Sequence, residues 1–189
     1  MTQLSGAEES ALLIARAADF AARAHVRQKR KGDAQEPYVN HLAEVALLLT
    51  EATRGGNPAL IAAGWLHDTL EDTATEREEL EALFGAQVAA IVAEVTDDKA
   101  LPKEERKRLQ VETAGSKSVS ARLLKIADKT SNLRAIALSP PVGGDIARRL
   151  EYVAWAEAVV DGCRGLNASL EAVFDDAARQ ALSLIGKGA

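Results

Sequence analysis

Apolar side chains recur three and four positions apart along most of this chain. Between Glu8 and Val26 the spacing is typical of a helix with one buried face. The same spacing predicts longer helices over His41 to Ala52, Pro58 to about Asp72, Thr75 to Gly85, Ser120 to Leu138, Ile146 to Cys163 and Ser169 to Ile185, with shorter ones over Gln87 to Thr96 and Glu104 to Thr113. No segment alternates apolar and polar residues for long enough to demand a strand. The pattern therefore predicts an all-α domain of about eight helices.

Residues that begin or end helices fall between these segments. Pro58 stands in a first helical turn, where its fixed φ is tolerated. Thr75 and Glu78 have the spacing of a capping box, and Gly85 follows as a helix-ending residue. No internal repeat or linker interrupts the series, so we expect residues 1–189 to form a single domain.

Composition agrees with a globular domain. The chain has 189 residues, of which 47% are hydrophobic, enough for a sizeable core. Its opening residues lack a basic segment followed by an apolar one, and no apolar run approaches the roughly 20 residues of a membrane span. We therefore expect a cytoplasmic protein that does not act at a membrane.

Charge and cysteine content narrow the choice of ligand. Cys163 is the one cysteine, which excludes a disulfide framework and a thiolate zinc site, so any metal must be held by histidine and carboxylate. A net charge of -5 argues against binding of a nucleic-acid polymer. Arg27, Lys29, Arg30 and Lys31 nevertheless form a basic run, which suits a small anionic ligand; the alternative is a solvated loop.

Four candidate metal-binding or catalytic side chains lie within the six residues that follow the apolar stretch 62–66. His67, Asp68, Glu71 and Asp72 fall on one side of a helix at about 100° per residue. Such charge beside apolar residues is unfavourable unless something neutralises it, and a divalent metal does so effectively. The alternative is a polar helix end that happens to be charged.

Two further residues could complete a metal site. Asp128 is a lone carboxylate on an apolar helical face, and His41 stands near the start of a helix, where the alternative is a histidine without a ligand role. Two imidazoles with two carboxylates suit Mn²⁺, Fe²⁺ or Zn²⁺ better than Ca²⁺.

Other polar residues lie one helical turn from these candidates. Glu71 and Asp72 follow His67 and Asp68 by four residues and could move the proton of a water, unless they are a solvated acidic end. Asn132 follows Asp128 by the same interval and would face whatever binds there.

Five ordered motifs resemble those of the RelA/SpoT alarmone hydrolases, especially the single-domain small alarmone hydrolases that include the metazoan SpoT homologue. They are Lys29-Arg30-Lys31, Pro37-Tyr38-Val39-Asn40-His41, Trp65-Leu66-His67-Asp68-Thr69-Leu70-Glu71-Asp72-Thr73, Val95-Thr96-Asp97-Asp98-Lys99 and Ile126-Ala127-Asp128-Lys129-Thr130-Ser131-Asn132-Leu133-Arg134. The resemblance runs from about Ala17 to Glu171. It implies an all-α HD domain, which agrees with the periodicity.

The resemblance also implies an activity: hydrolysis of the 3′-pyrophosphate of ppGpp or pppGpp to GDP or GTP and pyrophosphate, which lowers alarmone levels in the stringent response. The implied metal ligands, usually of Mn²⁺, are His41, His67, Asp68 and Asp128. Glu71 and Asp72 would serve the hydrolytic water.

The implied substrate contacts come from several parts of the chain. Arg30 and Lys31 would border the base or the ribose-phosphate, Lys103 would approach a phosphate, and Asn132 and Tyr152 would contact ribose and phosphate groups. On its own, Tyr152 with Trp155 reads as an aromatic pair of the core.

The chain departs from the commonest family pattern at Thr130-Ser131, where many relatives have a large apolar residue followed by Tyr or His. The resemblance places this position beside the nucleotide pocket. Alternative functions are an HD phosphohydrolase acting on pppApp or on the 2′-phosphate of NADPH, and a non-catalytic alarmone-binding module. The presence of Glu71, Asp72 and the ligand set argues against the last.

Overall fold

The computed structural model describes residues 5–140 and 145–187, and every regular element within these ranges is helical. The α-helices are α1 (Gly6–Ala24), α2 (Val39–Thr53), α3 (Pro58–Leu66), α4 (Thr69–Asp72), α5 (Arg77–Phe84), α6 (Ala86–Val95), α7 (Lys103–Thr113), α8 (Val119–Leu138), α9 (Ile146–Asp161) and α10 (Ala168–Lys187). A short 3₁₀ helix, η1 (Ala114–Ser116), lies between α7 and α8. The all-α prediction is confirmed, with more segments than the eight or so expected. No helix in these ranges is long and apolar enough to cross a membrane.

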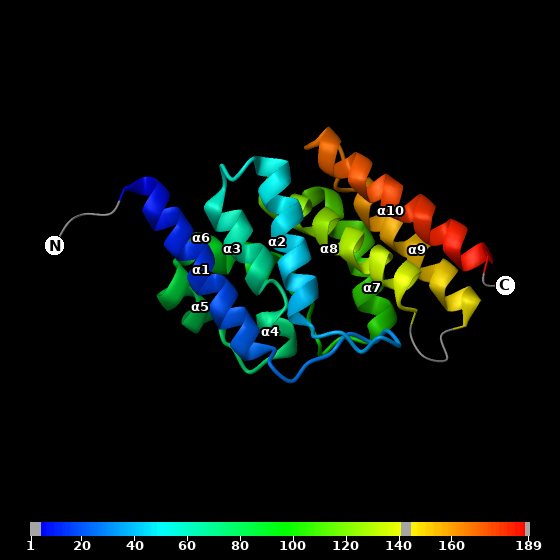
Figure 1. Ribbon diagram of the computed structural model, residues 1–189, viewed down its shortest axis with the longest axis horizontal. Helices are drawn as coiled ribbons and strands as arrows, with labels where there is room; N and C mark the ends of the chain where they lie inside the picture. The colour runs from blue at the N-terminus through cyan, green and yellow to red at the C-terminus, as the bar shows by residue number, and fades with distance from the viewer. Residues whose placement is uncertain (1–4, 141–144, 188–189) are drawn as a thin grey trace.

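Helix α8 is the central element, because α2, α6, α9 and α10 all pack against it (Figure 1). Helices α1, α2 and α3 pack together on one side, and α9 lies beside α10 on the other. The core between them contains fully buried side chains from several elements, among them Leu42, Leu60, Leu124 and Phe174. Burial of each such side chain contributes about 1.5–3 kcal/mol, so α8 is fixed on several sides.

Several predicted helix boundaries are confirmed. Pro58 occupies the first turn of α3, and the Asn57 side chain before it accepts a hydrogen bond from Leu60 N. Gly85 closes α5 with a φ of 86°, a left-handed value that favours glycine. The predicted capping box at Thr75 is wrong, because Glu76 is the N-cap of α5. The Thr75 hydroxyl instead accepts a hydrogen bond from the Thr73 hydroxyl.

The helix expected over 58–72 is interrupted, which corrects that prediction. Helix α3 ends at Leu66, and α4 starts at Thr69. The Thr69 hydroxyl donates to Leu66 O at 2.6 Å, and the His67 ring contacts Gly64 O at 2.9 Å. These side chains take carbonyls that a continuous helix would pair with its own backbone, so they favour a break. His67 and Asp68 consequently lie in a turn.

Gly64 lies where α3 crosses α2. A Cβ atom there would stand 2.8 Å from a Leu49 methyl carbon and 3.3 Å from Ala46 Cα. We expect Gly64→Ala to lower the free energy of unfolding by about 1–3 kcal/mol through overpacking. Denaturant unfolding followed by circular dichroism measures it. The control is Gly186→Ala, a helical glycine with open space around it; equal stability of both variants would contradict tight packing at this crossing.

Candidate metal centre and active site

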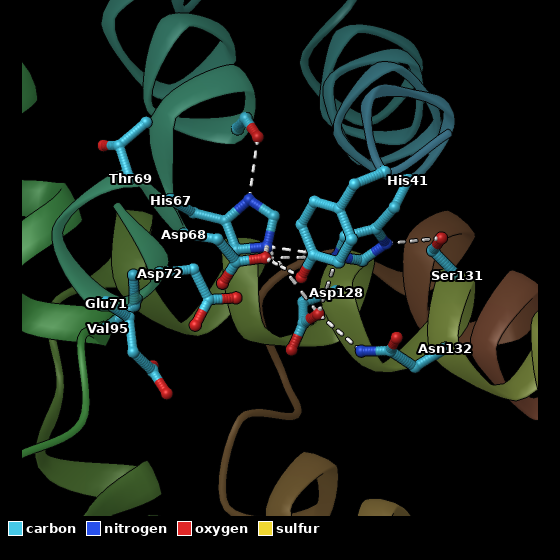
Figure 2. Close-up of polar contacts among 12 residues, drawn as sticks. His41, His67, Asp68, Thr69, Glu71, Asp72, Val95, Asp128, Ser131 and Asn132 are labelled. Carbon is cyan, nitrogen blue, oxygen red and sulfur yellow. Dashed lines mark hydrogen bonds and ion pairs between the residues drawn. The ribbon is translucent and has the colours of Figure 1, made fainter. Parts of the chain in front are cut away.

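Three separate elements bring the expected metal ligands to one point. His41 comes from the first turn of α2, His67 and Asp68 from the turn between α3 and α4, and Asp128 from the middle of α8. Figure 2 shows their side chains converging, although 87 residues separate His41 from Asp128 in the chain.

The converging atoms are imidazole nitrogens and carboxylate oxygens. His41 Nε2 lies 3.2 Å from His67 Nε2 and 3.3 Å from Asp128 Oδ1. Asp68 Oδ2 lies 3.0 Å from His67 Nε2 and 3.6 Å from His41 Nε2. The donor atoms of His41, His67 and Asp128 all lie within 4.8 Å of one another, and these residues could hold a metal ion.

The other nitrogen of each imidazole is occupied by the protein. His67 Nδ1 lies 2.9 Å from Gly64 O, and because a carbonyl only accepts, Nδ1 carries the proton. His41 Nδ1 lies 2.8 Å from Ser131 Oγ. Both Nε2 atoms are thus directed to the common centre, and neutral histidine ligands are held in this way in metal sites.

The cluster is buried and strongly charged. His41 is 1% exposed and His67 is 4% exposed. Burial opposes charge on Asp68, but the two imidazoles outweigh it and hold the pKa of that carboxyl well below its usual range. Burial also opposes charge on Asp128, where Lys129 first and then the imidazoles hold the pKa well below its usual range. Burial likewise opposes protonation of His67, yet the two carboxylates raise its pKa. Two ionised carboxylates at one point therefore attract a cation.

Tyr38 and Lys129, to which the sequence analysis assigns no role, support the two carboxylates. The Tyr38 hydroxyl donates to Asp68 Oδ2 at 2.6 Å, and Lys129 Nζ donates to Asp128 Oδ2 at 2.9 Å. Lys129 Nζ also lies 4.4 Å from the centre of the Trp155 ring. Both residues stand inside the motifs noted in the sequence, next to or near a ligand, but only the fold turns them toward it.

Glu71 and Asp72 differ in their surroundings. Glu71 lines a cavity of about 160 Å³ together with Asp68 and Asp128. Burial first, and then Asp97, raises the pKa of the Glu71 carboxyl, which suits a proton acceptor. Asp72 lies at the surface, where Lys99 Nζ and Gln28 Nε2 donate to its carboxylate at 2.7 and 3.0 Å.

The expected substrate residues divide into two groups. Asn132 lines the cavity and donates to Asp128 Oδ1 at 2.7 Å, while Arg30 donates to Asn132 Oδ1 at 2.8 Å. The basic run thus reaches the site through Arg30. Lys31 and Lys103 are exposed and do not line the cavity, so their contact with a phosphate stays a prediction.

Tyr152 and Trp155 lie on α9 with ring centres 5.3 Å apart, and both pack against the core. The core position expected for Trp155 is met only in part, because its side chain is half-buried against the core. Burial raises the pKa of the Tyr152 hydroxyl to about 12, so it is neutral and can donate a hydrogen bond. Its contact with a nucleotide stays a prediction.

The sequence matches the HD domain family over residues 17–156, a range that contains His41, His67, Asp68 and Asp128. The chain belongs to the HD domain family. The resemblance found in the sequence is thereby confirmed, and with it the helical HD fold.

Individual HD-domain relatives are similar along most of the chain. Guanosine-3′,5′-bis(diphosphate) 3′-pyrophosphohydrolase MESH1 of Homo sapiens is 49% identical over 166 residues, which are 88% of this chain and 92% of the relative. The MESH1 protein of Drosophila melanogaster is 45% identical over 161 residues, or 85% and 90%.

A solved structure of a metazoan ortholog of SpoT, described as hydrolysing ppGpp and playing a role in starvation responses, superimposes with a TM-score of 0.85. It is 41% identical, and the match covers 95% of this chain and 98% of the other. The fold around the HD residues is therefore shared with a protein of described activity.

Loss of a ligand should remove metal binding. We expect purified Asp128→Ala and His67→Ala variants to retain little of the divalent metal that the unchanged protein binds, because each variant deletes one donor from the centre. Metal analysis after dialysis measures it, with the exposed Asp19→Ala on α1 as the control. Undiminished metal content in both site variants would contradict this assignment.

Proposed function

We propose that this HD domain hydrolyses the 3′-pyrophosphate of ppGpp or pppGpp, giving GDP or GTP and pyrophosphate. The observation that carries the proposal is the buried convergence of His41, His67, Asp68 and Asp128 beside Glu71, in a chain nearly half identical to a protein named for this reaction. We place the reaction in the cytoplasm and expect it to lower alarmone levels.

We propose Mn²⁺ as the metal, with Fe²⁺ or Zn²⁺ as substitutes. The donor set fits such an ion, because both histidines aim Nε2 inward and two carboxylates supply hard oxygen atoms. A bound ion of this kind supplies a Lewis acid and lowers the pKa of a coordinated water.

The proposed base is Glu71. Its carboxyl lies on the cavity, and its raised pKa brings its proton affinity closer to that needed for accepting a proton near neutral pH. Asp72, bound by Lys99 and Gln28, would act from the rim by orienting water or returning a proton to the 3′-oxygen.

The proposed nucleotide contacts place positive charge near the phosphates. Arg30 would act at the base or ribose-phosphate side, with Lys31 beside it, and Lys103 would approach a phosphate from α7. Asn132 and Tyr152 would offer an amide and a hydroxyl to the ribose and phosphates. Support comes from the position of Asn132 in the cavity wall and from its hydrogen bond to Arg30.

Product analysis tests the reaction. We expect the Mn²⁺-loaded protein to release intact pyrophosphate from ppGpp and pppGpp in a single displacement at the phosphorus next to the ribose oxygen. Phosphorus NMR identifies the products, with pppApp, NADPH and GTP as comparison substrates. Orthophosphate with a 3′-monophosphate nucleotide would refute the mechanism, and reaction with NADPH alone would assign a different substrate.

Removal of the proposed base should separate catalysis from folding. We expect Glu71→Gln to keep its metal and its unfolding temperature but to lose roughly 10²-fold or more in kcat, since an amide cannot accept the proton. Steady-state kinetics on metal-loaded protein measures it, with Glu79→Gln on the exposed face of α5 as the matched control. Turnover close to that of the unchanged protein would show that Glu71 is not the base.

A further inference from the structure

A chain of polar side chains runs from His41 through α8 and back to α2. His41 Nδ1 lies 2.8 Å from Ser131 Oγ, and Ser131 Oγ donates to Glu44 Oε2 at 2.6 Å. Arg134, one turn after Ser131 on α8, donates to Glu44 Oε1 at 2.8 Å. The chain thus joins an expected metal ligand to a carboxylate three residues farther along α2.

The direction of each hydrogen bond follows from the chemistry of the groups. Ser131 is fully buried, and its hydroxyl has one proton, which a carboxylate partner can only accept. Ser131 Oγ therefore acts as the acceptor toward His41 and toward Arg30 Nη1, which lies 3.3 Å away. The proton between Ser131 and His41 must consequently sit on Nδ1.

Glu44 remains an acceptor because it stays ionised. Burial opposes its charge, but the hydrogen bonds from Ser131 and Arg134 outweigh that effect and lower the pKa of its carboxyl. Its ion pair with Arg134 leaves both partners only partly exposed, at 29% and 37% of their side chains. The Ser131 proton is thus held toward Glu44.

We propose that Glu44 and Ser131 are positioning residues, which fix the tautomer and ring orientation of His41 so that its Nε2 lone pair faces the metal. The inference rests on the metal site of the proposed function and adds to it two residues that are not ligands.

His67 is held by different means. Its Nδ1 donates to a backbone carbonyl, Gly64 O, which no side-chain substitution removes. His41 has a side-chain partner instead, so the orientation of this ligand depends on the identity of residues 44 and 131. Substitution at these two positions should therefore weaken metal binding through His41, while His67 keeps its backbone partner.

The experiment measures Mn²⁺ affinity by isothermal titration of the purified full chain. Ser131→Ala removes the acceptor for Nδ1–H, and Glu44→Ala frees the Ser131 hydroxyl to donate to Nδ1, which favours the wrong tautomer. We expect both variants to bind Mn²⁺ roughly 10- to 100-fold more weakly, the range typical of lost outer-shell partners. Glu44→Gln, which keeps an acceptor, should recover most of the affinity.

The matched control is Thr130→Val. It removes the neighbouring buried hydroxyl of α8, which donates to Ile126 O within the same helix. Its Mn²⁺ affinity should stay unchanged.

A second measurement follows the His41 Nδ1–H proton by NMR in the Zn²⁺-loaded protein. This proton should be visible in the unchanged chain and in Thr130→Val, and it should be lost through exchange with water in Ser131→Ala.

The outcomes separate the two proposals. Unchanged Mn²⁺ affinity in Ser131→Ala and Glu44→Ala, with only their unfolding temperature lowered, would overturn the positioning role and leave the metal site intact. If Ser131→Ala does not fold, Glu44→Ala decides the result. Failure of the unchanged chain to bind Mn²⁺ would overturn both, whereas Mn²⁺ binding without ppGpp hydrolysis would refute only the proposed function.

Discussion

Two ionised carboxylates lie against two imidazoles in the interior of this helical bundle, and their charge is the constraint that the surrounding structure satisfies. A buried charge is unfavourable unless it is paired and hydrogen-bonded. Tyr38, in the segment before α2, provides that support to Asp68, and Lys129, on α8, provides it to Asp128. The ionised oxygen atoms of these two carboxylates are what make the centre attractive to a divalent cation.

The backbone beside the centre is interrupted between α3 and α4, where His67 and Asp68 lie. Helix α3 stops at Leu66, and the side chains of His67 and Thr69 bond to carbonyls of its last turn. That break places His67 and Asp68 in a turn, next to each other and both facing inward. Both residues keep right-handed backbone angles in this turn, and Asp68 Oδ2 lies 3.0 Å from His67 Nε2.

The acidic residues around the centre differ in their exposure to solvent. Glu71 lies on the cavity with a raised pKa, while Asp72 is held at the rim by Lys99. Behind His41, the Glu44 carboxylate and the Ser131 hydroxyl form a polar path between α2 and α8. The carboxylate proposed as the base and the residues proposed to orient His41 thus belong to different parts of the periphery.

The sequence by itself determined the helical class, most helix ranges and the residue types of the centre, because helical periodicity and short charged motifs are local properties. Asp128 could be singled out, since a carboxylate on an apolar face is anomalous even without a partner. Local patterns could not reveal the break after Leu66, which depends on side-chain competition for backbone carbonyls.

Tertiary structure alone decided which of these residues meet. His41 and Ser131 are 90 residues apart, and Arg30 and Asn132 are 102 apart, yet each pair is in contact. Spacing along a chain carries no information about such distant contacts, which the packing of α2 and α3 around α8 sets. Only that packing turned separate histidines and carboxylates into one centre and gave Glu44 a partner.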